Sequence, residues 1–166
     1  IHTEVVTTLN ADADGNVVSV LGVTRNITER KRAEDAIRQL AFYDALTQLP
    51  NRRLLQDRIP QQIARARREQ NRIALLFIDL DKFKPINDQY GHSAGDQVLQ
   101  TIAQRLHEHV RGNDLVARLG GDEFAVLICG ADAEIQACEI AQRLLDALAK
   151  PIFYGATPLS VTISIG

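Results

Sequence analysis

The sequence predicts an α/β fold, a sandwich in which helices flank a mixed central sheet, because apolar runs of strand length alternate with amphipathic helices. Residues 73–80 have the pattern of a buried strand, and residues 96–110 gather their apolar side chains on one side of a helix. Residues 115–119 and 124–129 are two further strands, and the Gly-Gly-Asp sequence between them, residues 120–122, predicts a tight hairpin turn.

Two long helices and a last strand complete this α/β part. Residues 54–69 and 133–149 predict the helices, and residues 160–165 predict the strand. The first of these helices has several arginines on and near it, between residues 52 and 72. Such a basic face is either solvated or meets an anionic ligand, and the sequence leaves both readings open.

The N-terminal part has a different pattern. Residues 5–9 and 17–23 are rich in β-branched residues and flank turn formers at 12–16, which predicts a β-hairpin within residues 1–27. A lone hairpin is marginally stable, so we expect it to be the end of a larger sheet domain. Residues 28–42 predict a charged linker helix with a narrow apolar stripe. This helix is either a solvated connector or a short parallel coiled coil between two subunits.

Composition limits the possible partners. The 166 residues suffice for one domain plus a fragment, and the net charge of −2 gives no general attraction to nucleic acid or to an anionic membrane. Cys129 and Cys138 lack metal-ligand spacing, which predicts buried free thiols in a reducing, cytoplasmic compartment. No apolar run could cross a membrane, so this segment predicts no direct membrane contact. The chain starts without Met, so a membrane anchor elsewhere in the parent protein stays open.

Acidic residues follow two of the predicted strands. Asp79 and Asp81 come at the end of strand 73–80, and Asp122 and Glu123 lie at the tip of the hairpin. Each pair could simply mark a strand that reaches water. If the two strands are neighbours, however, their carboxylates converge at one edge of the sheet and form an all-oxygen site suited to Mg²⁺.

The segment 83–96 reads as a polar loop that leads into a helix. Lys84 could neutralise a phosphate. The side chains of Asn87 and Asp96 could match the hydrogen-bonding edge of guanine, because a carboxylate accepts and an amide both donates and accepts. Each of these residues would also be ordinary in a loop.

Four stretches follow one another in the α/β part: DALTQLPNR at 44–52, FIDLDKFKPIND at 77–88 with Gly91-His92 and Gly95-Asp96 after it, RLGGDEF at 118–124, and SIG at 164–166. In this order they resemble the GGDEF, or diguanylate cyclase, family, and the resemblance covers residues 43–166. The resemblance implies a palm-like fold similar to that of class III nucleotide cyclases. It also implies a homodimer in which two GTP molecules condense into cyclic di-GMP and two pyrophosphates.

The resemblance also implies roles for particular residues. Mg²⁺, or Mn²⁺, would be bound by Asp79, the backbone carbonyl of Leu80 and Asp122, and Asp122 would help to deprotonate the attacking hydroxyl with Glu123 close by. The implied nucleotide-binding residues are Phe83, Lys84, Asn87, His92 and Asp96. Arg111 and Asp114 resemble the RxxD motif at which the family binds cyclic di-GMP as an inhibitor.

Regions outside the cyclase stretch add three expectations. Residues 20–31 resemble the exit of a PAS sensor domain, so residues 1–27 are expected to be its C-terminal fragment. The chain ends at Gly166, before the family's later Lys/Arg pair and final helix, so the domain 43–166 is expected to be truncated and this piece could be inactive. The stretch 47–52 is frequent where a phosphodiesterase (EAL) domain follows, which hints at a bifunctional parent.

Three classes of function remain open on the sequence alone. The leading one is an enzyme, a diguanylate cyclase. The alternative is a catalytically silent module that binds GTP or cyclic di-GMP and controls an attached phosphodiesterase domain. The third is a dimerising signal relay built on residues 28–42, which is compatible with either of the others.

Overall fold

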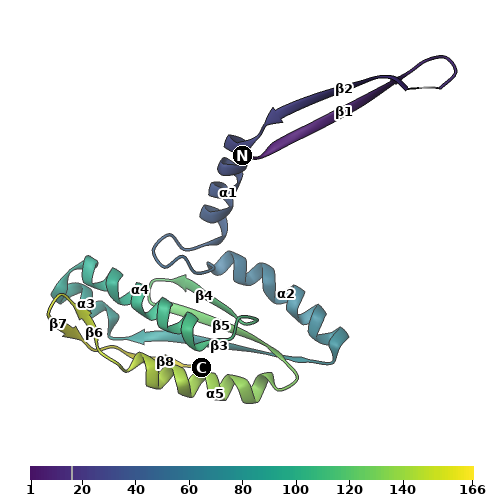
Figure 1. Ribbon diagram of the computed structural model, residues 1–166. Helices are drawn as coiled ribbons and strands as arrows, with labels where there is room; N and C mark the ends of the chain where they lie inside the picture. The colour runs from purple at the N-terminus through teal and green to yellow at the C-terminus, as the bar shows by residue number, and fades with distance from the viewer. Residues whose placement is uncertain (16) are drawn as a thin grey trace. The chain divides into compact units, whose positions relative to one another are not determined.

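The computed structural model describes residues 1–15 and 17–166, so Asn16, part of the predicted turn at 12–16, lies outside the described residues. The chain forms two compact units, Ile1–Ala41 and Phe42–Gly166 (Figure 1). None of the helices in the described residues combines the length and apolarity needed to span a membrane.

The first unit contains the predicted hairpin and most of the predicted helix. Strand β1 (Thr3–Ala11) pairs antiparallel with β2 (Val17–Asn26), and helix α1 (Thr28–Phe42) follows. The Asn26 Oδ1 accepts a hydrogen bond from the Thr28 backbone amide at 3.0 Å, an Asx turn that precedes the helix, and the Lys31 amide donates to the Ile27 carbonyl at 3.0 Å. The apolar stripe of α1 is open to solvent, with Ile37 66% and Leu40 78% exposed. The choice between connector and coiled coil therefore stays a prediction.

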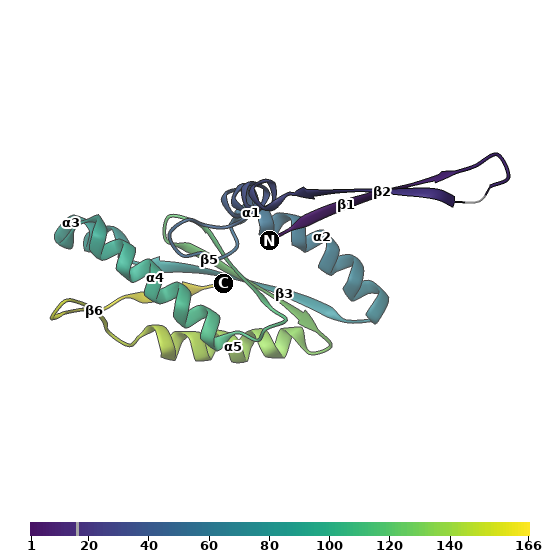
Figure 2. The same ribbon diagram turned by 45° about the horizontal axis from the view of Figure 1, so that its top comes forward.

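The second unit is the α/β domain. Its elements are α2 (Arg52–Glu69), β3 (Arg72–Asp81), α3 (Phe83–Tyr90), α4 (His92–His109), β4 (Leu115–Gly120), β5 (Glu123–Gly130), α5 (Ala133–Leu148), β6 (Ile152–Tyr154), β7 (Thr157–Leu159) and β8 (Thr162–Ile165). The central sheet has the strand order β4-β5-β3-β8. Helices cover both of its faces, α4 and α5 on one and α2 on the other (Figure 2).

Strand alternation divides the core between these two faces. Ile78 and Leu80 of β3 are 1% exposed and pack with α4 and α5 in the larger cluster. Leu55 of α2 packs on the opposite face with Ala125 and Leu127 of β5. Helix α2 starts at Arg52 because the Asn51 Oδ1 accepts a hydrogen bond from the Leu54 amide at 3.1 Å.

The α/β fold is confirmed, and the pairing of its strands differs from the expectation in one respect. A mixed sheet was expected, but the named strands of the described residues pair antiparallel throughout. The helices α3 and α4 do return the chain so that β4 runs parallel to β3. The hairpin partner β5 then lies between them, so the two parallel strands are not neighbours.

Four local details differ from what the sequence predicted. Residues 83–90 form helix α3 rather than a loop, and α4 starts at His92 rather than at residue 96, because Gly91, at φ +84°, turns the chain between the two helices. The small hairpin β6–β7 was missed, since its strands have three residues each. Cys138 is exposed and Cys129 is half-buried, so neither thiol is fully buried.

Candidate active site

The acidic residues of β3 and of the hairpin tip meet at one edge of the sheet, because β3 and β5 are neighbours, which was the condition that the sequence left open. Strand β3 pairs with β5 so that Asp79 lies directly opposite Glu123, and Asp122 precedes Glu123 in the turn. Burial, and then the negative charges of Asp122, Glu123 and Asp81, raise the pKa of the Asp79 carboxyl above its usual value. This mutual repulsion is what a bound cation would relieve.

Asp81 is engaged in the sheet in a way that sequence reasoning did not foresee. Its two carboxylate oxygens accept hydrogen bonds from the Thr162 hydroxyl at 2.9 Å and the Ser164 hydroxyl at 2.8 Å, both on β8. These bonds fasten β8 to the end of β3. Asp81 therefore has a structural role at this edge, whereas Asp79 faces the acids of the hairpin.

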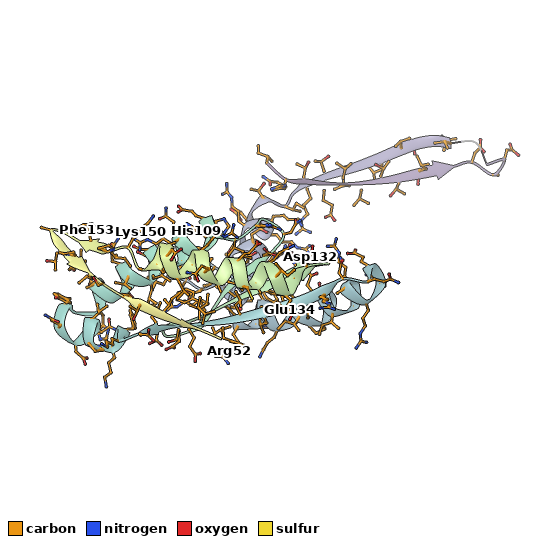
Figure 3. All side chains as sticks on the ribbon, turned by 90° about the horizontal axis from the view of Figure 1, so that it is seen from below. Arg52, His109, Asp132, Glu134, Lys150 and Phe153 are labelled. Atoms are coloured by element: carbon orange, nitrogen blue, oxygen red, sulfur yellow. The ribbon has the colours of Figure 1, made fainter. Side chains whose placement is uncertain are left out.

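A cavity of about 520 Å³ lies along this edge. Its walls include Phe77 and Asp79 of β3, Glu123 of β5 and Ser164 of β8. Arg52, which the sequence placed near the basic helix and in the stretch 44–52 without a role at the site, also lines it, and Figure 3 shows this side chain near the end of β8. The Arg52 Nη2 lies 3.3 Å from the Glu123 carboxylate. The cavity thus combines acidic side chains with one positively charged side chain, that of Arg52.

The oxygen atoms at this edge suit a magnesium ion whose remaining coordination positions are filled by a bound ligand. Among the described residues no three acidic, histidine or cysteine side chains form a ready-made metal site. Asp79 and Asp122 provide carboxylates from neighbouring positions, and the Leu80 carbonyl belongs to the same strand end, where the Leu80 amide donates to the Asp122 carbonyl at 3.3 Å. Proteins commonly hold Mg²⁺ with one or two carboxylates and let the phosphates of a substrate supply the remaining ligands.

The predicted nucleotide-binding residues lie on the helix pair that follows β3. Lys84 is exposed on α3, His92 is exposed as the first residue of α4, and Phe83 is half-buried against the core. Asn87 of α3 is half-buried, and Asp96 of α4 is exposed. The helices approach closely at Gly95, which is why the amide of Asn87 and the carboxylate of Asp96 come from adjacent turns of the two helices.

Gly95 leaves the space that the Asn87 side chain occupies. A Cβ atom at Gly95 would overlap the Asn87 Oδ1 and would lie 3.1 Å from the Phe83 ring. The resemblance implies that Asn87 contacts guanine, so we expect Gly95→Ala to displace the Asn87 amide and to raise the KM for GTP about tenfold, since a lost or misplaced hydrogen bond costs ~1–2 kcal/mol. The helix itself should keep its stability, because Ala is the better helix former.

This expectation is checked by initial-rate kinetics of the parent protein over a range of GTP concentrations. Gly22→Ala is the matched control, because a Cβ at that position meets no atom within 4 Å. An unchanged KM in Gly95→Ala would show that the position of Asn87 does not matter for GTP.

The residues of the predicted inhibitory motif lie between α4 and β4. Arg111 is exposed, and the Asp114 amide donates to the Arg111 carbonyl at 3.0 Å. The Asp114 carboxylate is turned toward the protein, where burial raises its pKa although backbone amides of Cys129 and Arg111 donate to it. Its Oδ2 is buried and has no hydrogen-bond partner among the described residues. A ligand donor would satisfy this atom.

The fold and its acidic edge define an α/β domain whose candidate site is carried by a strand end and a glycine hairpin. Comparison with known proteins is consistent with this class. The sequence profile described as "Diguanylate cyclase, GGDEF domain" matches residues 41–166. The chain therefore belongs to the GGDEF, or diguanylate cyclase, family.

Individual relatives agree with the family. MucR of Pseudomonas aeruginosa, named a bifunctional diguanylate cyclase/cyclic di-GMP phosphodiesterase, is 44% identical over 139 residues, which are 84% of this chain and 20% of MucR. The solved GGDEF domain of TpbB from Pseudomonas aeruginosa is 42% identical, with a TM-score of 0.72, over 75% of this chain and 73% of that one. The coiled coil and GGDEF domain of DgcB from Caulobacter crescentus, solved with c-di-GMP, is 28% identical, with a TM-score of 0.75, over 83% and 74%. The chain spans about a fifth of the length of the first curated relatives.

Proposed function

We propose that the protein of which this chain is part condenses two GTP molecules into cyclic di-GMP and two pyrophosphates. The observation that carries the proposal is the pairing of Asp79 with Glu123 across β3 and β5, with Asp122 beside them in the glycine turn. In each half of the reaction the 3′-hydroxyl of one GTP forms a bond to the α-phosphorus of the other. The bond to pyrophosphate breaks, and the proton of the hydroxyl passes to a base.

Each residue of the site has a role in this proposal. Asp79, the Leu80 carbonyl and Asp122 hold Mg²⁺ or Mn²⁺, which supplies charge stabilisation for the attacking and leaving oxygens when it is bound. Asp122 and Glu123 are the candidate bases at the tip of the hairpin, and Asp122 assists the loss of the hydroxyl proton. The roles rest on the family's motif and on the strand pairing that brings these carboxylates together.

The nucleotide is held by the α3–α4 helix pair. Asn87 and Asp96 take the guanine edge, His92 contacts the nucleotide, and Lys84 with the Phe83 backbone takes the phosphates. The short connection from β3 to α3 supports this arrangement, because α3 begins only two residues after the strand that carries Asp79 ends. A nucleotide with its phosphates at Asp79 can therefore reach the helix pair with its base.

The remaining partners belong to the same proposal. Two cyclase domains face each other as a homodimer, and Arg111 with Asp114 binds cyclic di-GMP as an inhibitor, which the unsatisfied Asp114 Oδ2 supports. Residues 1–27 are the end of a PAS domain, and residues 28–42 form the signalling linker. The likeness to MucR supports a following phosphodiesterase (EAL) domain in the parent. The reaction takes place in the cytoplasm, where GTP is available.

The test is incubation of the full-length protein with GTP and Mg²⁺, followed by chromatography of the nucleotides. The wild type is expected to release cyclic di-GMP and pyrophosphate, and Asp122→Ala is expected to release neither. If the wild type binds GTP and forms no product, the protein is a regulatory nucleotide-binding module instead.

A further inference from the structure

Arg118 connects the glycine turn to a loop at the start of the domain. This residue lies on β4, and its side chain is only 11% exposed. Its Nε and Nη2 atoms donate to the Gly121 carbonyl at 3.1 and 2.7 Å, and its Nη1 donates to the Asp44 Oδ1 at 2.8 Å. A guanidinium holds its donors in a rigid plane, so these bonds fix the Gly121 carbonyl relative to Asp44.

Asp44 is itself held in place. The Thr47 amide and hydroxyl donate to its Oδ1 at 2.9 and 2.7 Å, and its own amide donates to the Leu49 carbonyl at 2.8 Å. Partial burial raises the pKa of Asp44, but the hydrogen bonds from Thr47 and Arg118 outweigh this and keep the pKa below its usual value. Asp44 is therefore a fixed, charged anchor for Arg118.

The turn needs such an anchor because its own residues do not restrict it. Gly120 and Gly121 have φ values of +140° and +54°. Because glycine has no side chain, its backbone can move away from these φ values to many others without a steric clash. The carbonyls around the turn are bound from outside instead. Arg52 Nε donates to the Leu119 carbonyl at 3.2 Å, in addition to the bonds from Arg118 to Gly121.

We propose that Arg118 is a positioning residue that holds the glycine turn, and with it the Asp122 carboxylate, where the cyclase reaction requires it. This inference rests on the proposed function. Arg118 does not line the cavity at the acidic edge. It acts through the Gly121 carbonyl, which belongs to the peptide unit that leads into Asp122. Because a misplacement of about 1 Å can cost ~100-fold in rate, the bonds of one buried guanidinium are enough to matter.

The decisive variant is Arg118→Gln in the full-length protein. We expect kcat for cyclic di-GMP formation to fall ~30- to 100-fold while the KM for GTP changes less than about threefold, because the guanine contacts lie on α3 and α4. We also expect amide hydrogen exchange, measured without nucleotide or metal, to become at least about tenfold faster in residues 119–123 and to stay unchanged in residues 73–78 of β3.

Two further variants separate positioning from general stability. Asp44→Asn keeps the shape of the anchor but removes its charge, so we expect a smaller fall in kcat, about tenfold, with the same local change in exchange. Glu134→Gln is the matched control. Glu134 lies on α5 (Figure 3), and its ion pair with Arg72 joins two exposed side chains, Glu134 at 79% and Arg72 at 71%. That control should leave both kcat and exchange unchanged.

The outcomes decide between the two proposals. If the wild type forms no cyclic di-GMP, the proposed function is wrong, whereas the exchange experiment still tests whether Arg118 holds the glycine turn. If the wild type is active and Arg118→Gln keeps kcat within twofold, or loses activity without faster exchange at 119–123, the positioning role is wrong. If Arg118→Gln does not fold, the same two criteria applied to Asp44→Asn decide.

Discussion

Asp79→Asn is expected to lower kcat for cyclic di-GMP formation by about 10³-fold or more, because the loss of a metal-binding carboxylate removes several kcal/mol of transition-state stabilisation. The same change should make the protein without metal slightly more stable. Asp79 lies opposite Glu123 and close to Asp122, and burial together with these charges raises its pKa. An uncharged amide of the same shape removes that repulsion, so we expect the melting temperature to rise by ~1–2 °C at pH 7.

The pH dependence of this gain has a definite sign. Because the pKa of Asp79 is raised in the folded protein, its ionised form destabilises the fold above that pKa, and the penalty disappears as the pH falls below the unfolded value of about 3.9. The advantage of Asp79→Asn should therefore be present at pH 7 and absent at about pH 3.5. Differential scanning calorimetry at both pH values checks it, beside product chromatography for the activity.

Asp57→Asn is the matched control for both measurements, since Asp57 is an exposed carboxylate on α2 and does not line the cavity at the acidic edge. It should change neither the rate nor the melting temperature. Activity of Asp79→Asn within tenfold of the wild type would show that Asp79 does not bind an essential cation. A lower melting temperature would mean that its carboxylate stabilises the fold through a contact other than the acidic edge.

Phe124→Ala is expected to lower the free energy of unfolding of the 42–166 unit by ~3–5 kcal/mol, because it removes a large side chain from a close-packed core. Phe124 is 0% exposed and belongs to the cluster formed by β3, β5, α4 and α5. A typical domain is stable by only ~5–15 kcal/mol, so this loss leaves a small margin. Since Phe124 directly follows Glu123, activity should fall with the folded fraction.

Urea unfolding of the full-length protein, followed by circular dichroism, measures this loss. Phe153→Ala is the matched control: Phe153, on the β6–β7 hairpin, is 64% exposed (Figure 3). Its replacement should cost less than about 0.5 kcal/mol. A loss in Phe124→Ala below about 1.5 kcal/mol would mean that the core collapses around the missing ring rather than leaving a cavity.

The sequence by itself determined the parts of this protein that depend on local pattern. The apolar run that forms β3, the apolar side of α4 and the glycine turn were all readable, because each structure requires a side-chain period or a conformation that few residues supply. The convergence of Asp79 with Asp122 could be stated only as a condition, namely that the two strands be neighbours.

The tertiary structure decided which strands are neighbours and which distant groups bond to one another. The strand order β4-β5-β3-β8 puts Asp79 opposite Glu123 and separates the parallel strands. It also joins Asp81 to β8 and Arg118 to Asp44, 74 positions away. None of these bonds leaves a sign in the local sequence, since a hydrogen bond between distant residues requires only a donor and an acceptor that the fold brings together.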